Sequence, residues 1–296
     1  MVDRKSHRGG ATLEPMTQKR ATFQLGRIAC INVLPVYHDL NDVWEQAAPF
    51  PLQVVPGHPT ALNALLAEGA LDLSPVSSIE VAHHPGRYLI VDGLSIQSAG
   101  PVQSVVLVSK HPIEKLTGKT IGRTTASATS RVLLNVLLSQ TVGVKPEFVD
   151  MPSELEEPLD HFDAALLIGD AALQYTPPRK SHTYDLGELW YRSTNTPMVF
   201  AMWAVRADLD AAGLERARQV AKALWRSRER GTGHMAAIVR EAAGQVDLSE
   251  RAVAAYYRHL RYDLDGRAVT GLKLFYECAV RTGDLKTAPA LEFLGR

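Results

Sequence analysis

The chain has 296 residues, enough for about two domains of roughly 150 residues, each with its own apolar core. Hydrophobic residues make up 46% and charged residues 22% of the sequence, which is typical of globular proteins and excludes an intrinsically disordered or fibrous chain. The 32 Lys and Arg residues balance the 32 Asp and Glu residues, so no net positive field attracts a polyanion. We therefore expect neither nucleic acid nor a membrane as a partner.

The sequence shows no membrane-spanning segment, no secretory signal and no cysteine motif. The longest apolar runs, residues 164–168 and 198–205, are far shorter than the roughly 20 residues that cross a bilayer. Residues 1–24 are basic and lack the apolar stretch of a secretory signal, which predicts a flexible tail on a cytoplasmic protein. The two cysteines, Cys30 and Cys278, are too few and too distant for a metal knuckle or a disulfide framework, so we expect reduced thiols.

The first part of the chain alternates short β-like runs with helical patterns. Pro35 suits the first turn of a helix, and Leu62, Leu65 and Leu66 have the spacing of one buried helical face. The predicted strands are 26–31, 52–55 and 71–76, and the predicted helices begin near 35, 59 and 77. This order is typical of a mostly parallel sheet covered by helices.

A second alternating series follows, and the chain ends in helices. Its predicted strands are 103–109, 119–122, 148–149, 163–168 and 198–205, with helices over 112–118, after 124–130 and over 171–175. From residue 208 to 282 the pattern is helical, with expected interruptions at the glycines 231, 233, 244 and 266.

Two α/β series predict two lobes with a ligand cleft between them. We expect residues 25–107 and 201–296 to form a discontinuous first lobe and residues 108–200 to form the second. Open α/β sheets bind ligands beyond the carboxyl ends of their strands. The candidate site residues are therefore those that follow the predicted strands.

Asparagine and serine follow two strands of the first lobe. Asn32 is either an ordinary turn or cap residue, or an amide that donates and accepts hydrogen bonds to a ligand. Ser77 and Ser78 stand at a helix start, where they either cap the helix or face the cleft.

The second lobe carries a richer turn. Residues 124–130 hold five hydroxyl groups, more than one helix cap needs, and the free N–H groups and dipole of a helix start attract anions. A multiply hydrogen-bonded loop is the alternative. Gly169 allows close backbone approach, and Asp170 either caps the next helix, binds a ligand hydroxyl or transfers a proton.

Motifs for metals and cofactors are missing. Ten histidines occur, but none shows the H-E-x-x-H spacing that places two rings on one helical face. The glycine-rich dinucleotide and P-loop fingerprints and the G-x-S-x-G elbow are also absent from the sequence. We expect neither a metal nor an organic cofactor.

Taken together, the ordered segments resemble the chorismate dehydratase family, which opens the futalosine route to menaquinone. The resemblance extends from about Arg27 to about Gly283. It rests on the segments N32-V-L-P35, G69-x-L-D72, V76-S-S-I-E80, G100-P-V-x-S-V105, S127-A-T-S130, D163-A-A-L-L-I-G-D-A-A-L173, D185-L-G-x-x-W190 and V199-F-A-x-W-A-V-R206.

The resemblance implies a type II periplasmic-binding-protein-like fold in the α/β class and a hydro-lyase that needs no cofactor. The implied substrate is chorismate, which would lose water to give 3-[(1-carboxyvinyl)oxy]benzoate. Asn32 and Ser104 are the expected catalytic residues, with Asn32 orienting the enolpyruvyl group or the leaving hydroxyl. The expected substrate-binding residues are Ser77, Ser78, Thr125, Ser127, Ala128, Thr129, Ser130, Gly169 and Asp170.

Two other functions remain open from the sequence. One is the 1,4-dihydroxy-6-naphthoate synthase of the same pathway, which has similar lobes and a different substrate. The other is a solute-binding protein for a small carboxylate, for which residues 1–24 offer no export signal and no lipobox cysteine.

Overall fold

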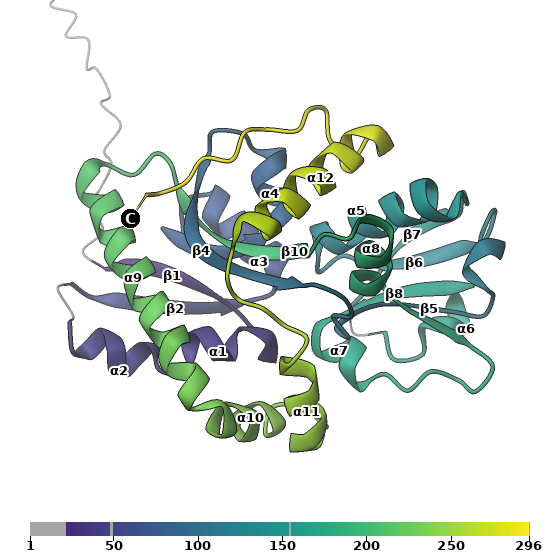
Figure 1. Ribbon diagram of the computed structural model, residues 1–296, viewed down its shortest axis with the longest axis horizontal. Helices are drawn as coiled ribbons and strands as arrows, with labels where there is room; N and C mark the ends of the chain where they lie inside the picture. The colour runs from purple at the N-terminus through teal and green to yellow at the C-terminus, as the bar shows by residue number, and fades with distance from the viewer. Residues whose placement is uncertain (1–21, 48–49, 154, 296) are drawn as a thin grey trace, which may run out of the picture.

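The computed structural model describes residues 22–47, 50–153 and 155–295, folded around two five-stranded sheets that lie side by side (Figure 1). Most of the predicted tail lies outside these ranges, and Phe23 and Gln24, its last two residues, already belong to a strand. In the described ranges, no helix combines the length and the apolar composition needed to cross a bilayer.

The first sheet has the strand order β2-β1-β3-β10-β4. Strands β1, β2 and β3 run parallel, as predicted, while β10 is antiparallel to both β3 and β4 and returns the chain to this lobe. The strands are β1 (Phe23–Ile28), β2 (Leu52–Gly57), β3 (Leu73–Ser77), β4 (Tyr88–Ser98) and β10 (Met198–Arg206).

Strand β4 is missing from the sequence prediction. Its middle carries Asp92-Gly93, a pair typical of turns, but the chain continues as a strand with Gly93 at φ +69°. The pairing of β4 with β10 shifts register between Ser95 and Ile90, so the glycine lies at an irregularity rather than at a turn.

The second sheet has the order β7-β6-β8-β5-β9. Strand β6 is parallel to β7 and β8, and β5 is antiparallel to β8 and β9. The short strand β9 was also not predicted. The strands are β5 (Val105–Ser109), β6 (Thr120–Thr124), β7 (Glu147–Met151), β8 (Ala164–Ile168) and β9 (His182–Asp185).

Sheet membership places the crossings between the lobes at residues 99–104 and 195–197. All of β5 lies in the second sheet and all of β10 in the first, so the predicted boundaries at 107/108 and 200/201 fall inside these strands. Both crossings are therefore a few residues earlier in the chain than the sequence suggests.

Helices cover both sheets. Glycine 231 does not interrupt the chain as expected: α9 continues to Gly233, and a side chain at Gly231 would meet the carbonyl oxygen of Pro35 at 2.6 Å, so the glycine allows α9 and α1 to approach. The first lobe carries η1 (Ile31–Val33), α1 (Leu34–Tyr37), α2 (Leu40–Glu45), α3 (Pro59–Ala67), α4 (Ser78–His83), α9 (Ala211–Gly233), α10 (Met235–Ala243), α11 (Glu250–Tyr257) and α12 (Gly266–Thr282). The second carries η2 (Ile113–Lys115), α5 (Ala128–Val136), η3 (Leu137–Val142), α6 (Pro158–His161), α7 (Gly169–Gln174) and α8 (Leu186–Thr194).

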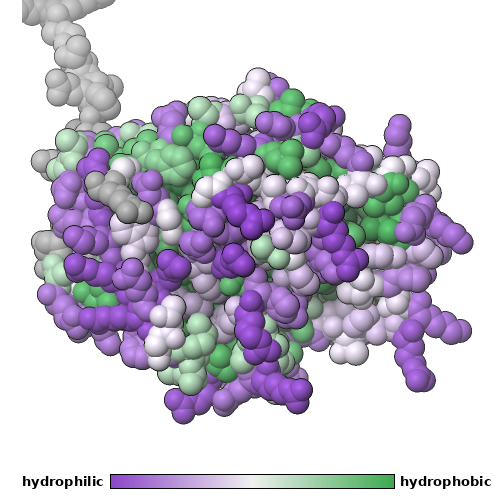
Figure 2. Space-filling view, viewed as in Figure 1, coloured by the Kyte–Doolittle hydropathy of each residue, from purple (hydrophilic) through white to green (hydrophobic). Residues whose placement is uncertain are grey.

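Apolar burial joins the two lobes. One cluster of buried side chains runs from Leu25 and Trp203 in the first sheet to Leu107 and Leu166 in the second. Figure 2 shows polar residues over much of one face of the molecule, with smaller apolar areas between them. Among the described residues, the large apolar side chains that are exposed are Val149 and Phe293. Burial of this continuous apolar core favours a fixed arrangement of the two lobes relative to each other.

Candidate functional site

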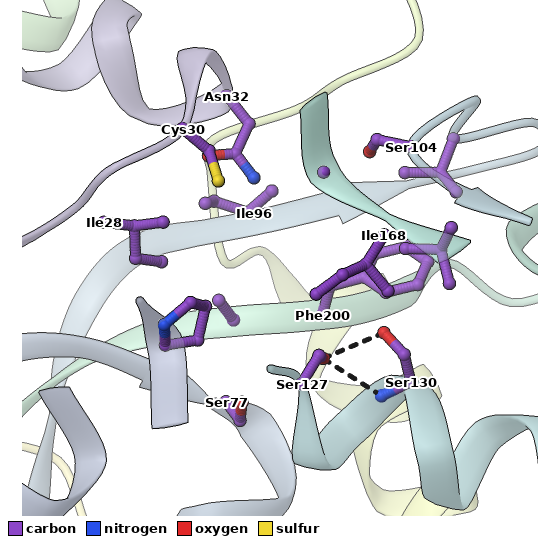
Figure 3. A pocket seen from close by; sticks show the side chains of 15 residues that line it. Ile28, Cys30, Asn32, Ser77, Ile96, Ser104, Ser127, Ser130, Ile168 and Phe200 are labelled. Carbon is purple, nitrogen blue, oxygen red and sulfur yellow. Dashed lines mark hydrogen bonds between the residues drawn. The ribbon is translucent and has the colours of Figure 1, made fainter. Parts of the chain in front are cut away.

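Five strands end at one pocket between the lobes. Strands β1, β2 and β3 lead into η1, α3 and α4, and β6 and β8 lead into α5 and α7. Figure 3 shows this pocket, which is partly open to solvent. Its lining residues are Ile28, Cys30, Asn32, Pro59, Ser77, Ile96, Val102, Ser104, Val105, Ser127, Ser130, Ile168, Gly169, Phe200 and Ala201. The location matches the general rule for open α/β sheets.

The pocket brings six of the predicted residues together: Asn32, Ser77, Ser104, Ser127, Ser130 and Gly169. Ser77 precedes α4, but its side chain does not cap that helix. Cys30 and the apolar wall, including Phe200, were not predicted from the sequence. The position of Cys30, two residues after β1 and two residues before Asn32, is the sequence signal that could have identified it.

Asn32 lies in the turn between β1 and α1 and caps no helix, since Cys30 and Val33 hold the two N-cap positions. Its backbone carbonyl accepts a hydrogen bond of 2.8 Å from the hydroxyl of Tyr262, which fixes the turn. Its Oδ1 atom is buried and has no hydrogen-bond partner in the described part of the chain. A buried acceptor without a partner is expensive, so this atom is suited to a donor on a ligand.

Ser104 is held by a tyrosine from the far end of the sequence. The hydroxyl of Tyr256, on α11, donates a 3.0 Å hydrogen bond to Oγ of Ser104. Burial raises the pKa of Tyr256 far above its ordinary value, so the phenol stays protonated and remains a donor. Because Ser104 accepts from Tyr256, its own proton is available to a ligand in the pocket.

Ser127 and Ser130 belong to the hydroxyl-rich turn for which the sequence left two interpretations open. Oγ of Ser127 accepts a hydrogen bond from the backbone N–H of Ser130 and so caps α5, and the two hydroxyl oxygens are 2.9 Å apart. Both residues also line the pocket. The capped start of α5 thus presents hydroxyls and a helix dipole to the cavity.

The remaining predicted binding residues do not line the pocket. Thr125 is exposed, Thr129 is buried, and Ala128 forms the first turn of α5 behind its cap. Ser78 and Asp170 also lie outside the wall. All five residues follow strand ends and so were expected at the cleft. Four of them form hydrogen-bond contacts with the opposite lobe instead: Ser78, Thr125, Thr129 and Asp170.

These contacts between lobes are specific. Thr129 Oγ1 accepts from the backbone N–H of Ile79 at 3.2 Å and lies 3.2 Å from Oγ of Ser78, which donates to the carbonyl of Val199 at 2.8 Å. The hydroxyl of Thr60 donates to the carbonyl of Thr125 at 2.8 Å. A hydrogen-bonded seam thus closes one side of the pocket.

Asp170 closes another side. Its Oδ1 accepts from the backbone N–H of Ile31 at 3.3 Å, so α7 of one lobe contacts the turn that carries Asn32. Burial raises the pKa of Asp170, and the hydrogen bond from Ile31 opposes that shift. Asp170 therefore joins the lobes rather than capping α7, whose N-cap is Ile168.

The pocket surface carries no charge. None of the lining residues is Lys, Arg, Asp or Glu. Burial, with a smaller effect from the nearby Asp170, raises the pKa of the Cys30 thiol to about 12, so the thiol stays neutral and is a poor nucleophile. Attraction for an anion must come from the helix starts and the hydroxyl and amide groups.

Comparison with known proteins identifies the family of the chain. The family model described as "Menaquinone biosynthesis" matches residues 23–281. A protein of Thermus thermophilus named "Chorismate dehydratase" is 30% identical over 271 residues, covering 86% of this chain and 94% of the relative.

Solved structures show the fold. A protein from Archaeoglobus fulgidus superposes with a TM-score of 0.74 at 18% identity, covering 90% of this chain and all of its own. The periplasmic aliphatic sulphonate-binding protein of Escherichia coli superposes with a TM-score of 0.65 at 12% identity, covering 93% of this chain and 96% of its own. The predicted two-lobed fold like that of periplasmic binding proteins is confirmed, and the chain belongs to the menaquinone biosynthesis family.

Proposed function

We propose that this protein is a chorismate dehydratase, which removes water from chorismate to give 3-[(1-carboxyvinyl)oxy]benzoate. The observation that carries the proposal is a pocket with no charged lining residue, where five strand-to-helix turns meet and where Oδ1 of Asn32 has no hydrogen-bond partner among the described residues. The Thermus thermophilus relative named for this activity supports it.

The pocket suits a small dicarboxylate. The start of α5, capped by Ser127, offers hydrogen-bond donors and a positive dipole end to one carboxylate. The apolar wall formed by Ile96, Ile168 and Phe200 suits the carbocyclic ring.

The reaction needs orientation more than a strong base. The C4 hydroxyl leaves with a proton from the ether-bearing C3, and the ring becomes aromatic. Among the described residues no Asp, Glu, His, Lys or Arg side chain lines the pocket, and the Cys30 thiol stays protonated, so we assign proton removal to a carboxylate of the substrate itself, which the pocket holds near its own C–H. Ser104, with its proton free, is placed to donate to the departing hydroxyl.

Incubation of the purified protein with chorismate tests the proposal. We expect a single aromatic product whose mass is lower by one water. Turnover of the substrate of 1,4-dihydroxy-6-naphthoate synthase, with chorismate left unchanged, would favour that alternative instead. Tight binding of chorismate without conversion would favour a solute-binding protein.

We expect the activity to survive metal removal. No ionisable ligand set lines the pocket, so neither substrate binding nor proton removal requires a metal ion there. Enzyme treated with EDTA and desalted should keep its kcat on chorismate. Loss of turnover that returns only with an added divalent ion would contradict this prediction.

Ser127→Ala should weaken binding of the dehydrated product by about 1.5 to 3 kcal/mol if its hydroxyl donates to a carboxylate. Loss of its cap on α5 should also cost about 1 kcal/mol of folding free energy. Calorimetric titration beside thermal melts measures both effects.

Asp210→Ala is the matched control, because Asp210 caps α9 through the N–H of Gly213 and does not line the pocket. It should lose similar stability and keep its product affinity. Equal affinities for both variants and the native protein would remove the start of α5 from the binding site.

A further inference from the structure

A second cluster of chemically active side chains lies where the ends of four helices meet, outside the pocket lining. His38 follows α1, Asp39 precedes α2, and His234 joins α9 to α10. One ligand atom from each of these three residues lies within 4.8 Å of the other two. None of the three lines the pocket, so the cluster is separate from the proposed chemistry.

The carboxylate of Asp39 is the centre of this cluster. Asp39 stands at the N-cap of α2 but does not cap it; its two oxygens lie 2.9 and 3.0 Å from Nδ1 of His234. The side chain of Asp39 is only 7% exposed. A buried carboxylate that turns both oxygens to one imidazole nitrogen is favourably placed to share a cation with it.

Glu241 supplies a carboxylate partner for the His38 ring, as metal-bound imidazoles usually have. Its Oε2 lies 2.5 Å from Nδ1 of His38. A carboxylate at one ring nitrogen fixes the ring and leaves the other nitrogen for an ion. His234 is 54% exposed and His38 is 23% exposed, so an ion can enter from solvent.

We propose that His38, Asp39 and His234 bind one divalent transition-metal ion of the zinc type, with Glu241 orienting His38. Two imidazoles and one carboxylate are a common donor set for zinc, and water would complete the coordination. Ligands of one zinc ion lie roughly 3.3 Å apart, given bonds of about 2.0–2.1 Å. The ligand atoms here lie within 4.8 Å of one another, so any pair near that limit must draw together when the ion binds.

The ion would act as a structural link. It would tie the end of α1, the short helix that follows Asn32, to the junction of α9 and α10, almost 200 positions later in the chain. Metal binding to the folded state alone stabilises that state. A bound ion at this cluster would contradict the expectation, drawn from histidine spacing, that the chain holds no metal, without giving the ion a catalytic role.

The test is zinc titration of chelator-stripped, desalted protein against a colorimetric competitor. We expect one equivalent bound by the native protein, a higher melting temperature with zinc and no such effect of magnesium. His234→Ala should lose that equivalent and the rise in melting temperature, while Glu241→Gln should bind zinc about 10 to 100-fold more weakly.

His161→Ala is the matched control, an exposed histidine of the other lobe, and should bind zinc as the native protein does. Melting of the stripped variants shows that each is folded before zinc is added. No bound equivalent in the native protein, or equal binding by His234→Ala, would mean an adventitious ion only and would overturn the proposal. Because activity is not the readout, the result is independent of the proposed function.

Discussion

Ser104→Ala is expected to lower kcat on chorismate by about a hundredfold, the usual effect of removing one well-placed hydrogen-bond donor from an active site. The reason is the direction of the hydrogen bond from Tyr256, which leaves the proton of Ser104 for the ligand. Steady-state kinetics on chorismate measures the change. Unaltered kcat in a folded variant would show that Ser104 is only part of the wall.

Tyr256→Phe separates positioning from chemistry. It removes the 3.0 Å hydrogen bond and lets the hydroxyl of Ser104 rotate, so we expect a smaller loss of kcat, about tenfold. In the Ser104→Ala, Tyr256→Phe double variant the two losses of kcat should not add, because without the serine hydroxyl there is nothing for Tyr256 to orient. Additive losses would mean that Tyr256 acts through packing of α11 instead.

Asn32→Ala is expected to lower kcat by about tenfold or more, which corresponds to about 1.4 kcal/mol of transition-state stabilisation. The melting temperature should change little, because Oδ1 of Asn32 makes no hydrogen bond within the described protein and the turn is fixed through its backbone carbonyl by Tyr262. Kinetics and thermal melts on the same preparation test both statements.

Asn32→Asp is the isosteric companion. It keeps an acceptor at the position of Oδ1 but replaces the amide donor and adds negative charge to a pocket proposed to hold carboxylates, so substrate affinity should fall as well as kcat. If Asn32→Ala melts early and its folded fraction is fully active, Asn32 serves the turn alone.

The order of strands, turns and helices along the sequence predicted part of the pocket lining. Hydroxyl and amide residues directly after strands end at the pocket because parallel strands deliver their carboxyl ends to one edge, as with Asn32 and Ser127. The order of elements along the sequence does not determine which way each side chain points. Thr129 was expected at the ligand, but its hydroxyl bonds across the cleft to the backbone N–H of Ile79, a pairing that depends on how the lobes dock.

Contacts between residues far apart in the sequence could not be predicted from motifs or from residue spacing. The hydroxyl that orients Ser104 comes from Tyr256, 152 positions later. His234 meets Asp39 across 195 positions, so a search for histidines on one helical face finds neither partner. In the same way, Asp92-Gly93 predicts a turn locally, and only pairing with β10 keeps the chain extended there.

Proton NMR of chorismate incubated with the native protein, beside the same experiment with the Asn32→Ala, Ser104→Ala double variant, is the most direct test of the proposed function and its site. We predict that the ring signals of chorismate are replaced by those of a 3-substituted benzoate that keeps its vinyl protons, and that the double variant converts chorismate at least about a hundredfold more slowly. Unchanged chorismate with native protein, a product that has lost pyruvate, or full activity in the folded double variant would contradict the account.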